Sequence, residues 1–255
     1  MTADRHDSLV ESQFSPQAAA YVTSAVHAEG DDLRELADMV RGRPDARVLD
    51  LGCGGGHVSF RLAPLVREVV AYDLSPAMLA VVAAEAVKRG LSNIVTCEGP
   101  VEQLPFDAGA FDVVVSRYSA HHWSDFRAGL REARRVVTAR GCAGFADVVT
   151  PGSPLLDTHL QAIELLRDPS HLRNYTQEEW RQALTAAGFE PGPATLRRLR
   201  LDFAAWVERM RTPKIHVEAI RSLQTRMPAE VVRHFAVEAD GSFTLDTMTQ
   251  AARPV

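Results

Sequence analysis

The chain has 255 residues, of which 46% are hydrophobic and 24% are charged. This mixture is typical of one globular unit, and it excludes a disordered chain, a coiled coil and a collagen-like repeat. The formal net charge is −5, whereas a nucleic-acid-binding protein more often carries a basic excess. We therefore expect no nucleic acid among the partners.

The cysteines and the N-terminus bear on the cellular compartment. Cys53, Cys97 and Cys142 cannot all pair with one another and show no C-x-x-C spacing, so we predict reduced thiols. No segment approaches the roughly 20 apolar residues of a membrane span. Residues 1–13 are polar and lack the basic start and apolar core of a signal peptide. We expect a cytoplasmic protein with no membrane partner.

The first predicted elements are two helices that follow this polar start. Ser15 and Pro16 have the form of an N-cap and a proline at the first helical position, and this helix is expected to run to about residue 27. A second helix begins at Asp31 or Asp32, and Gly42 is placed to end it.

From residue 47 to residue 149, short apolar runs alternate with helical patterns. The predicted strands are 47–50, 68–73, 94–98, 111–116 and 142–149, and the predicted helices are 57–63, 76–89 and 125–137. Alternating elements with strands that are apolar on both faces favour a parallel sheet covered on both sides. Ligands of such sheets bind at the carboxyl ends of the strands.

Beyond Pro151 the simple alternation ends. The predicted helices are 154–167, 176–187, 203–211, 215–227 and 229–237, and the predicted strands are 195–201 and 242–251. The three helices between the last two strands are too many for a hairpin loop. We interpret them as an insertion that covers one edge of the sheet.

The strongest chemical signal is a glycine-rich turn after the first predicted strand, residues 50–56, with the sequence D-L-G-C-G-G-G. Glycines let the backbone approach a ligand closely, and a plain strand-to-helix turn would not need four of them. The dinucleotide fingerprint G-x-G-x-x-G fails because His57 stands at its third glycine. Asp50 would repel a pyrophosphate but suits a cationic amino group.

A second acid, Asp73, ends the second predicted strand. A carboxylate at this position can accept hydrogen bonds from both hydroxyls of a ribose. The alternative interpretation is an acid that caps a helix or lies in a loop.

Four segments, in order, resemble the successive motifs of class I S-adenosylmethionine-dependent methyltransferases: 50–56, Asp73, 98–106 and 111–116. Within this class, the motifs are most similar to those of the ubiquinone/menaquinone-biosynthesis-like group (methyltransferase type 11). The resemblance covers residues 47–149. It implies a Rossmann-like three-layer α/β sandwich with a mostly parallel seven-stranded sheet, an antiparallel last strand and a helical cap. Within one domain, residues 1–45 would cap the cofactor site, 46–150 would bind the cofactor, and 151–255 would complete the sheet with substrate-side helices.

The resemblance implies S-adenosyl-L-methionine as cofactor and S-adenosyl-L-homocysteine as product. The residues implied for the methionine portion are Gly52, Gly54, Gly56, Ser116 and Arg117, with Asp50 near its amino group. The residues implied for the nucleoside are Asp73 at the ribose, Leu74 and Met78 at the adenine, and the Val101 N–H at the adenine edge. Phe14 and Tyr21 would belong to a helix that closes over the cofactor, although core packing is an equal alternative for Tyr21.

One departure from the family pattern concerns adenine recognition. The group commonly has an acid after the glycine of the third motif, and this chain has Pro100 instead. The hydrogen bond to the adenine amino group is then absent or comes from elsewhere, and Glu102 is one candidate.

A loop with two adjacent histidines, residues 117–123, follows the fourth predicted strand at the ligand edge. Histidine titrates near neutral pH and is the usual general base, so we expect His121 or His122 to be catalytic. The alternative is that one ring bonds to backbone and the other faces solvent. Adjacent histidines without nearby cysteines or suitably spaced acids are a poor metal site, and we expect no metal.

Four further residues are expected on the substrate side: Tyr118, His171, Arg173 and Tyr175. An ordinary helix–helix connection is the alternative for the last three. The function that follows is direct methyl transfer to a small-molecule substrate by a monomer or homodimer. A non-catalytic S-adenosylmethionine-binding protein, a nicotinamide-dependent oxidoreductase and a protein or RNA methyltransferase stay open as alternatives.

Overall fold

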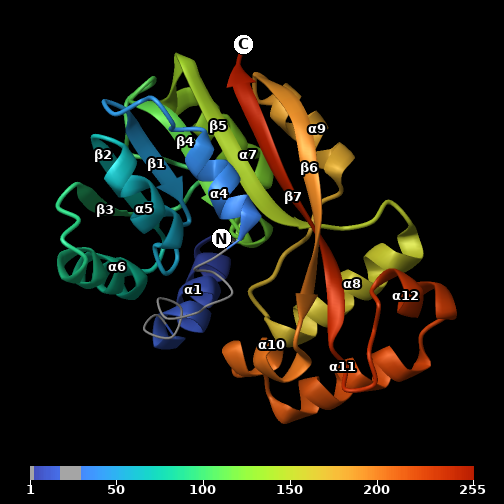
Figure 1. Cartoon of the computed structure of the whole chain (residues 1–255). Helices are drawn as coiled ribbons and strands as arrows, with labels where there is room; N and C mark the ends of the chain where they lie inside the picture. The colour runs from blue at the N-terminus through green and yellow to red at the C-terminus, as the bar shows by residue number, and fades with distance from the viewer. Residues whose placement is uncertain (1–2, 18–29) are drawn as a thin grey trace.

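The structure, a computed structural model, describes residues 3–17 and 30–255. Seven strands form one sheet in the order β3-β2-β1-β4-β5-β7-β6 (Figure 1). The strands are β1 Arg47–Leu51, β2 Glu68–Asp73, β3 Ile94–Glu98, β4 Phe111–Arg117, β5 Val137–Val149, β6 Phe189–Leu201 and β7 Phe243–Pro254. β7 pairs antiparallel with β5 and with β6, and the pairs among β1 to β5 are parallel. The predicted topology is confirmed.

Helices cover both faces of the sheet. One face carries α4 (Asp31–Asp38), α5 (His57–Leu62) and α6 (Pro76–Lys88), and the other carries α7 (Phe126–Val136) and α9 (Gln177–Ala186). Adjacent residues of β1 show the division, because Val48 packs with α4 and α5 whereas Leu49 packs with α7 and α9. The strands are apolar on both faces for this reason, and the three-layer sandwich is confirmed.

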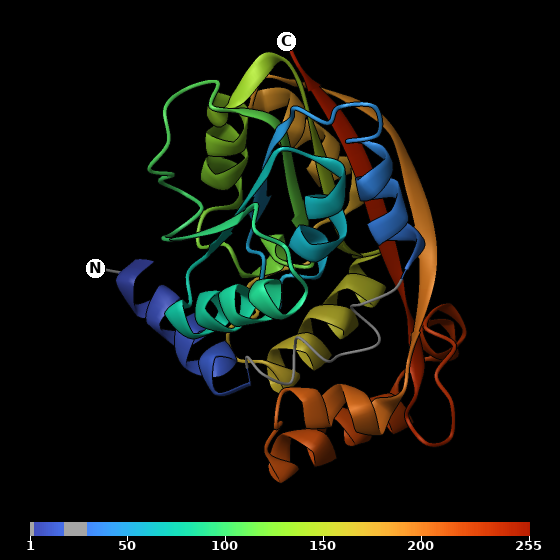
Figure 2. The ribbon, with the colours of Figure 1, turned by 60° about the vertical axis from the view of Figure 1, so that its left-hand side comes forward.

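The last third of the chain forms a second, smaller packing unit at one end of two long strands. β6 and β7 extend beyond the other strands, and helices gather around their far ends (Figures 1 and 2). These helices are α8 (Pro154–Arg167), α10 (Phe203–Arg209), α11 (Lys214–Arg226) and α12 (Ala229–His234). Leu160, Trp206, Ile220, Phe235 and Phe243 are buried among them. The expected insertion is present, but it packs on α8 and the strand ends and does not lie along the edge strand β6.

Two element boundaries differ from the sequence expectation for physical reasons. β6 begins at Phe189 and not at residue 195, since Pro191 and Pro193 hide the start of the strand and its pairing shifts register between Pro191 and Ala194. β5 begins at Val137 and not at 142, with an irregularity where it pairs with the start of β4.

The N-terminal segment is helical, although the sequence predicted no helix before Ser15. α1 spans Ala3–Phe14 and is followed by the 3₁₀ turn η1 (Ser15–Gln17). The helix predicted to begin at Ser15 is wrong at its first residues, and the rest of it lies outside the described residues. α1 was missed because it has few apolar side chains, so its pattern resembles a solvated segment. No helix in residues 3–17 and 30–255 is long and apolar enough to cross a membrane.

Candidate functional site

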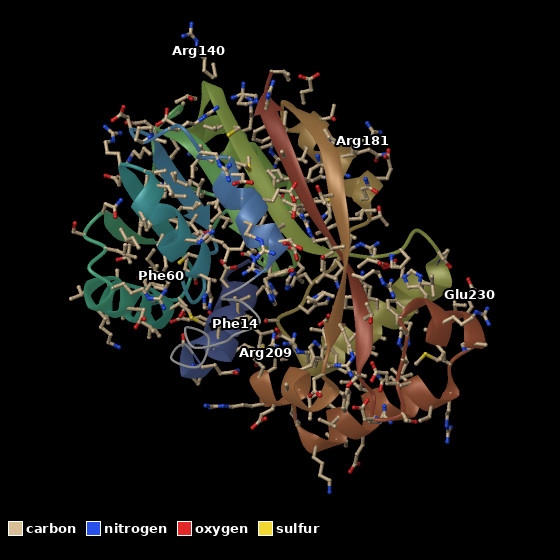
Figure 3. The ribbon with its side chains drawn as sticks, in the orientation of Figure 1. Phe14, Phe60, Arg140, Arg181, Arg209 and Glu230 are labelled. Atoms are coloured by element: carbon tan, nitrogen blue, oxygen red, sulfur yellow. The ribbon has the colours of Figure 1, made fainter. Side chains whose placement is uncertain are left out.

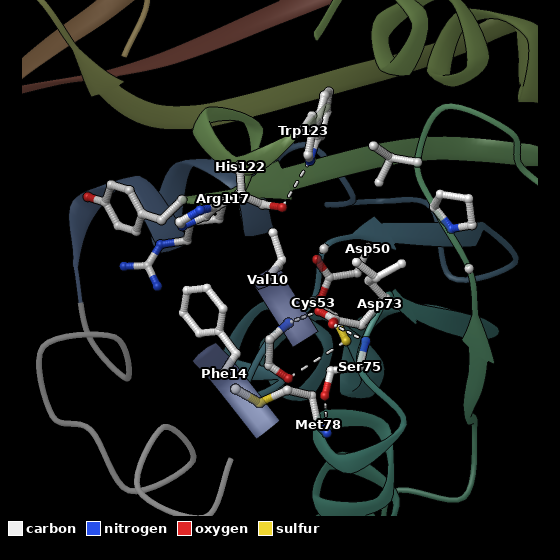
Figure 4. A pocket seen from close by; sticks show the side chains of 18 of the residues that line it. Val10, Phe14, Asp50, Cys53, Asp73, Ser75, Met78, Arg117, His122 and Trp123 are labelled. Carbon is white, nitrogen blue, oxygen red and sulfur yellow. Dashed lines mark hydrogen bonds between the residues drawn. The ribbon is translucent and has the colours of Figure 1, made fainter. Parts of the chain in front are cut away.

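A cavity that is partly open to solvent lies at the carboxyl ends of β1, β2 and β4 (Figure 4). Its walls come from the glycine turn, the end of β2, residues 99–102, the segment 117–124 and one face of α1. Three separate motifs of the sequence therefore meet at one edge of the sheet, as the parallel topology requires.

The glycine turn presents bare backbone to the cavity. Gly52 has φ 66° and Gly54 has φ 48°, both in the left-handed region that favours glycine. A Cβ on Gly52 would lie 1.9 Å from Oγ of Ser119, whereas a Cβ on Gly54 would meet no atom within 4 Å. Gly54 therefore leaves open space in which a ligand can approach the chain. Gly56 does not line the cavity, and a Cβ there would lie 2.9 Å from the Phe60 ring.

Asp73 connects the glycine turn to the start of α6. Its Oδ2 accepts from the Gly54 N–H at 2.8 Å and its Oδ1 accepts from the Ser75 N–H at 2.9 Å. Burial raises the pKa of Asp73, although these N–H groups oppose the shift. Each carboxylate oxygen retains a second lone pair, so the partly exposed group can still accept from a ligand in the cavity. Ser75 caps α6 through the Met78 N–H, as predicted.

Asp50 is a second carboxylate in the cavity wall and is 1% exposed. Its Oδ2 accepts from both the backbone N–H of Ser59 (3.0 Å) and the hydroxyl of Ser59 (2.6 Å) in the first turns of α5. Burial raises the pKa of Asp50 to about 7, against the effect of those hydrogen bonds. A cation beside the carboxylate would stabilise its ionised form.

Arg117 supplies a positive charge at the end of β4. Its Nε donates to Oδ2 of Asp32 at 2.6 Å, and the two side chains are only 5% and 10% exposed. Burial would raise the pKa of Asp32, but Arg117 holds it below its ordinary value. Arg117 lines the cavity, whereas Ser116 does not, because its buried hydroxyl donates to the Leu51 carbonyl at 2.8 Å. The ion pair with Asp32 therefore holds the Arg117 guanidinium in place at the cavity wall.

Of the six remaining residues expected to bind the cofactor, five line the cavity. Leu74, Met78, Val101 and Glu102 all line the cavity. Phe14 lines it from α1, and Tyr21 lies outside the described residues.

Glu102 is partly occupied by a protein contact. Its Oε1 accepts from the Asp125 N–H at 3.0 Å, which ties it to the start of α7. Burial raises the pKa of Glu102. The contact with Asp125 therefore takes up part of the hydrogen-bonding capacity of this carboxylate.

α1 closes one side of the cavity. It is anchored by the Ser15 hydroxyl, 2.9 Å from that of Ser75 on α6, and by Asp7, which accepts from the Ser124 hydroxyl at 2.9 Å. The Phe14 ring meets the His122 ring edge to face at 5.0 Å between centroids. The contacts reach both β2 and β4 ends, so α1 bridges the cavity.

The two adjacent histidines form the short turn η3 (Ala120–His122) and have different partners. Nδ1 of His121 lies 2.6 Å from Oδ1 of Asp147, and Nδ1 of His122 lies 3.1 Å from the Ser170 carbonyl. Of the two, only His122 lines the cavity of Figure 4. Burial would lower the pKa of His121, but Asp147 raises it above its ordinary value. Burial and the neighbouring His121 lower the pKa of His122 to about 4.

Of the four residues expected on the substrate side, only Tyr118 lines a cavity. Tyr118 lines the cavity, and its φ of 52° is rare for a residue with a side chain. Such local strain is common at functional sites.

The other three residues make structural contacts and line neither this cavity nor its neighbour. His171 Nε2 lies 3.0 Å from Oε1 of Gln161, and burial lowers the pKa of His171 to about 2. Arg173 pairs with acids on two neighbouring helices. Tyr175 stacks on the Phe126 ring at 4.0 Å between centroids.

Other lining residues had not been singled out from the sequence: Asp7, Val10, Cys53, Ser119, Trp123 and Ser124. Three of these lie in or just after the histidine loop, whose place at the sheet edge was expected. Asp7 and Val10 carried no signal, because α1 itself was not predicted. Among the residues that the structure describes, no group of three His, Cys, Asp or Glu is placed to hold a metal ion.

A family model described as a methyltransferase domain matches residues 49–145. The uncharacterised protein YafE of Escherichia coli (strain K12) is 47% identical over 195 residues, which cover 76% of this chain and 94% of that protein. The uncharacterised methyltransferase YcgJ of Bacillus subtilis (strain 168) is 31% identical over 245 residues, 96% of this chain and 93% of that one. A demethylmenaquinone methyltransferase of Chlorobaculum parvum is 30% identical over 124 residues, about half of each chain (48% and 49%).

The solved structures agree. The crystal structure of YcgJ superimposes with a TM-score of 0.84 and 29% identity, covering 88% of this chain and 99% of that one. The sheet order, the antiparallel last strand and the ligand edge described above are those of a Rossmann-like methyltransferase. The chain therefore belongs to the class I S-adenosylmethionine-dependent methyltransferases.

Proposed function

We propose that this enzyme binds S-adenosyl-L-methionine in the cavity of Figure 4 and transfers its methyl group to a small molecule. One observation carries the proposal: the open backbone at Gly54 and the carboxylates of Asp73 and Asp50 meet in one cavity. A ligand with a ribose and a cationic amino group matches these three features. S-adenosyl-L-homocysteine would be the product.

The nucleoside end would lie between β2 and residues 99–102. Asp73 would accept from the ribose hydroxyls with the lone pairs that Gly54 and Ser75 leave unused. Leu74 and Met78 would pack against the adenine. The Val101 N–H and the Glu102 carboxylate would meet the adenine edge, the latter in place of the acid missing at Pro100.

The methionine end would lie over the glycine turn. Asp50 would attract the amino group, and Arg117, held by Asp32, would attract the carboxylate. Gly52 sets the path of the turn, while Gly54 leaves the space that the ligand needs. The polar ends of the cofactor thus meet charges of opposite sign.

When bound, the cofactor supplies a methyl group on a sulfonium, which is already a good leaving group. The chain's main contribution is alignment, an effect worth up to ~7–11 kcal/mol in well-oriented cases. Phe14 and α1 exclude water from one side. Where the nucleophile carries a proton, the turn with His121 and His122 supplies the base.

The same proposal assigns roles along the chain. Residues 1–45 would cap the cofactor, 46–150 would bind it, and 151–255 would complete the sheet and hold the acceptor. A small acceptor is favoured because the net charge is −5 and helices close the substrate side. A protein or RNA methyltransferase would more often present a basic docking surface.

Isothermal titration with S-adenosyl-L-homocysteine tests the proposal directly. We expect a dissociation constant on the order of micromolar, which is about 8 kcal/mol of binding free energy. NAD, titrated under the same conditions, is expected to give no heat of binding. Tight NAD binding without a response to S-adenosyl-L-homocysteine would identify an oxidoreductase-like cofactor site and reject the proposal.

A further inference from the structure

A second cavity, partly open to solvent, adjoins the first. Phe14, Tyr118 and His122 line both cavities and form the boundary between them. The other walls come from the ends of β5, β6 and β7 and from α8 and α10, including Arg209, which Figure 3 labels near Phe14. A group transferred across this boundary leaves the first cavity and enters the second.

One histidine of the turn, His121, has the hydrogen-bond arrangement of a general base at the second cavity. His121 lines it, and Nδ1 of His121 is held 2.6 Å from Oδ1 of Asp147, which is 3% exposed. With its Nδ1 proton donated to the carboxylate, the ring keeps a lone pair on Nε2. That nitrogen has no hydrogen-bond partner among the described residues, and the side chain is 16% exposed. The ring is oriented by one nitrogen and available through the other.

His122 has a different environment and suits a wall better than a base. Its Nδ1 contacts the Ser170 carbonyl, and its Nε2 lies 3.9 Å from Oδ2 of Asp168. Burial and the neighbouring His121 lower the pKa of His122 to about 4, so the ring is neutral and a weak base at neutral pH. Its edge-to-face contact with Phe14 fixes it at the boundary of the two cavities.

A buried amide without a partner marks a second polar point in the cavity. Asn174 lines it and is 1% exposed. Its Nδ2 makes no hydrogen bond to any described residue. Leaving such a group unsatisfied costs about 1–3 kcal/mol, so an oxygen of a bound molecule would stabilise the site.

The rest of the wall combines apolar side chains with charged groups whose formal charges cancel. Seven apolar or aromatic side chains line it: Phe14, Tyr118, Val148, Leu199, Leu201, Trp206 and Leu245. The charged lining groups are two acids and two arginines, Glu164, Asp168, Arg167 and Arg209. Arg167 lies 3.5 Å from Glu164 and over the Trp206 ring. An uncharged ring system suits this lining better than an ion.

We propose that the second cavity binds the methyl acceptor, an uncharged ring compound with an acidic hydroxyl of the phenol or enol type, and that His121 removes the hydroxyl proton. The assignment rests on the proposed methyl transfer from the first cavity. The acceptor oxygen forms a bond to the methyl carbon as the carbon–sulfur bond breaks, and the sulfur keeps the electron pair. The hydroxyl proton goes to Nε2 of His121. Asp147 is a positioning residue, and Asn174 holds a second oxygen or the ring substituent that carries one.

2-Naphthol is a suitable probe because it is planar, apolar and carries one acidic hydroxyl. Its binding is measured by titration into the full chain saturated with S-adenosyl-L-homocysteine, beside 2-naphthylamine. We expect 2-naphthol to bind, and Asn174→Leu to weaken that binding by about tenfold, the size of one lost hydrogen bond. His159→Gln is the matched control, since His159 lies on α8 but lines neither cavity. It is expected to leave binding unchanged.

Turnover is followed by transfer of a radiolabelled methyl group to 2-naphthol, with the product identified by its mass. We expect His121→Gln to lower kcat by about 10²–10⁴-fold, the usual contribution of a general base, while S-adenosyl-L-homocysteine binding stays within threefold of wild type. His122→Asn is expected to have the smaller effect on kcat.

The pH profile separates catalysis from a structural role. The base form of His121 is neutral, so the rate is expected to fall as pH drops through a pKa that Asp147 holds above the ordinary value. The groups that act on this ring are the acids Asp147, Glu164 and Asp168 and the neighbouring rings of His122 and His171, and Arg167 lines the same cavity. Asp147→Asn is expected to move the fall to lower pH, whereas lost structure would lower the rate at every pH.

Three results would overturn this inference while leaving the proposed function intact. They are S-adenosyl-L-homocysteine binding without 2-naphthol binding, equal or faster transfer to 2-naphthylamine, and a His121→Gln variant with unchanged kcat. Loss of S-adenosyl-L-homocysteine binding in the wild-type chain would instead reject the proposed function itself.

Discussion

The two adjoining cavities are built in different ways. The first is set by backbone: the Gly52 and Gly54 turn, and two carboxylates, Asp73 and Asp50, that accept from backbone N–H groups. The second is set by side chains from α1, α8, α10 and the ends of three strands. Backbone geometry tolerates few substitutions, whereas apolar side chains can be exchanged at modest cost. With the proposed roles, the same scaffold can hold one cofactor firmly while the lining of the second cavity varies.

The largest expected effect follows from a substitution that distorts the glycine turn of the first cavity. Gly52→Ala would place a Cβ 1.9 Å from the Ser119 hydroxyl at a φ of 66°. The strained backbone alone costs about 1–3 kcal/mol, and the clash adds to it. We expect S-adenosyl-L-homocysteine affinity to fall by roughly a hundredfold or more, measured by titration calorimetry. Gly152→Ala, with no atom within 4 Å of its Cβ, is the control and should bind normally.

The next effect concerns Asp73, the acid that we propose holds the ribose. Asp73→Ala removes the charged acceptor of both ribose hydroxyls, and we take a total loss of roughly 1.5–3 kcal/mol because contacts to one carboxylate are not additive. We expect affinity for S-adenosyl-L-homocysteine to fall by about ten- to 150-fold, with the unfolding transition retained. The exposed Asp107→Ala serves as the matched control. Binding of Asp73→Ala within threefold of wild type would show that Asp73 is not the ribose acid.

A buried ion pair and an exposed one on the same helix give a paired test. Asp32→Asn removes the carboxylate that pairs with the buried Arg117, and breaking a buried ion pair costs about 3–5 kcal/mol. Asp31→Asn breaks only an exposed pair with Arg34, worth about 0–1 kcal/mol. Chemical denaturation should therefore separate the two variants clearly. Equal free energies of unfolding would contradict the role given to Asp32.

The smallest effect is a pH dependence of cofactor binding. The pKa of Asp50 is raised to about 7, and only its ionised form attracts a cationic amino group. Affinity for S-adenosyl-L-homocysteine should thus fall with decreasing pH, by up to about eightfold between pH 7.5 and 6 if only the ionised form binds. Asp50→Asn should bind weakly at both values and lose this dependence. A pH-independent wild type would place the amino group elsewhere.

The first cavity was largely predictable from sequence, because its parts are contiguous motifs at the ends of successive strands. The glycine turn and Asp73 needed only the parallel topology to be brought together. The fold followed for the same reason, since alternating apolar runs determine strands, helices and their order. Where proline interrupted the pattern, as at Pro191, the strand boundary was missed.

The second cavity was not predictable, because no motif connects its parts. Asn174, Arg167 and Trp206 lie in different helices or loops, and only tertiary packing brings them to one wall. Sequence indicated a base at His121 or His122 without distinguishing them. The distinguishing partner, Asp147, stands 26 residues further along the chain on a neighbouring strand. α1 was missed for a related reason, since its few apolar residues are used for the cavity.

The most direct test of the two-cavity account is a crystal structure of the protein with S-adenosyl-L-homocysteine. The account predicts the nucleoside on Asp73, and the sulfur at the boundary formed by Phe14, Tyr118 and His122. It also predicts at least one imidazole of the turn within about one water of the transfer path. The account would be contradicted if the His121 and His122 ring centres both lay beyond about 10 Å from the sulfur, too far for hydrogen-bond reach through one water.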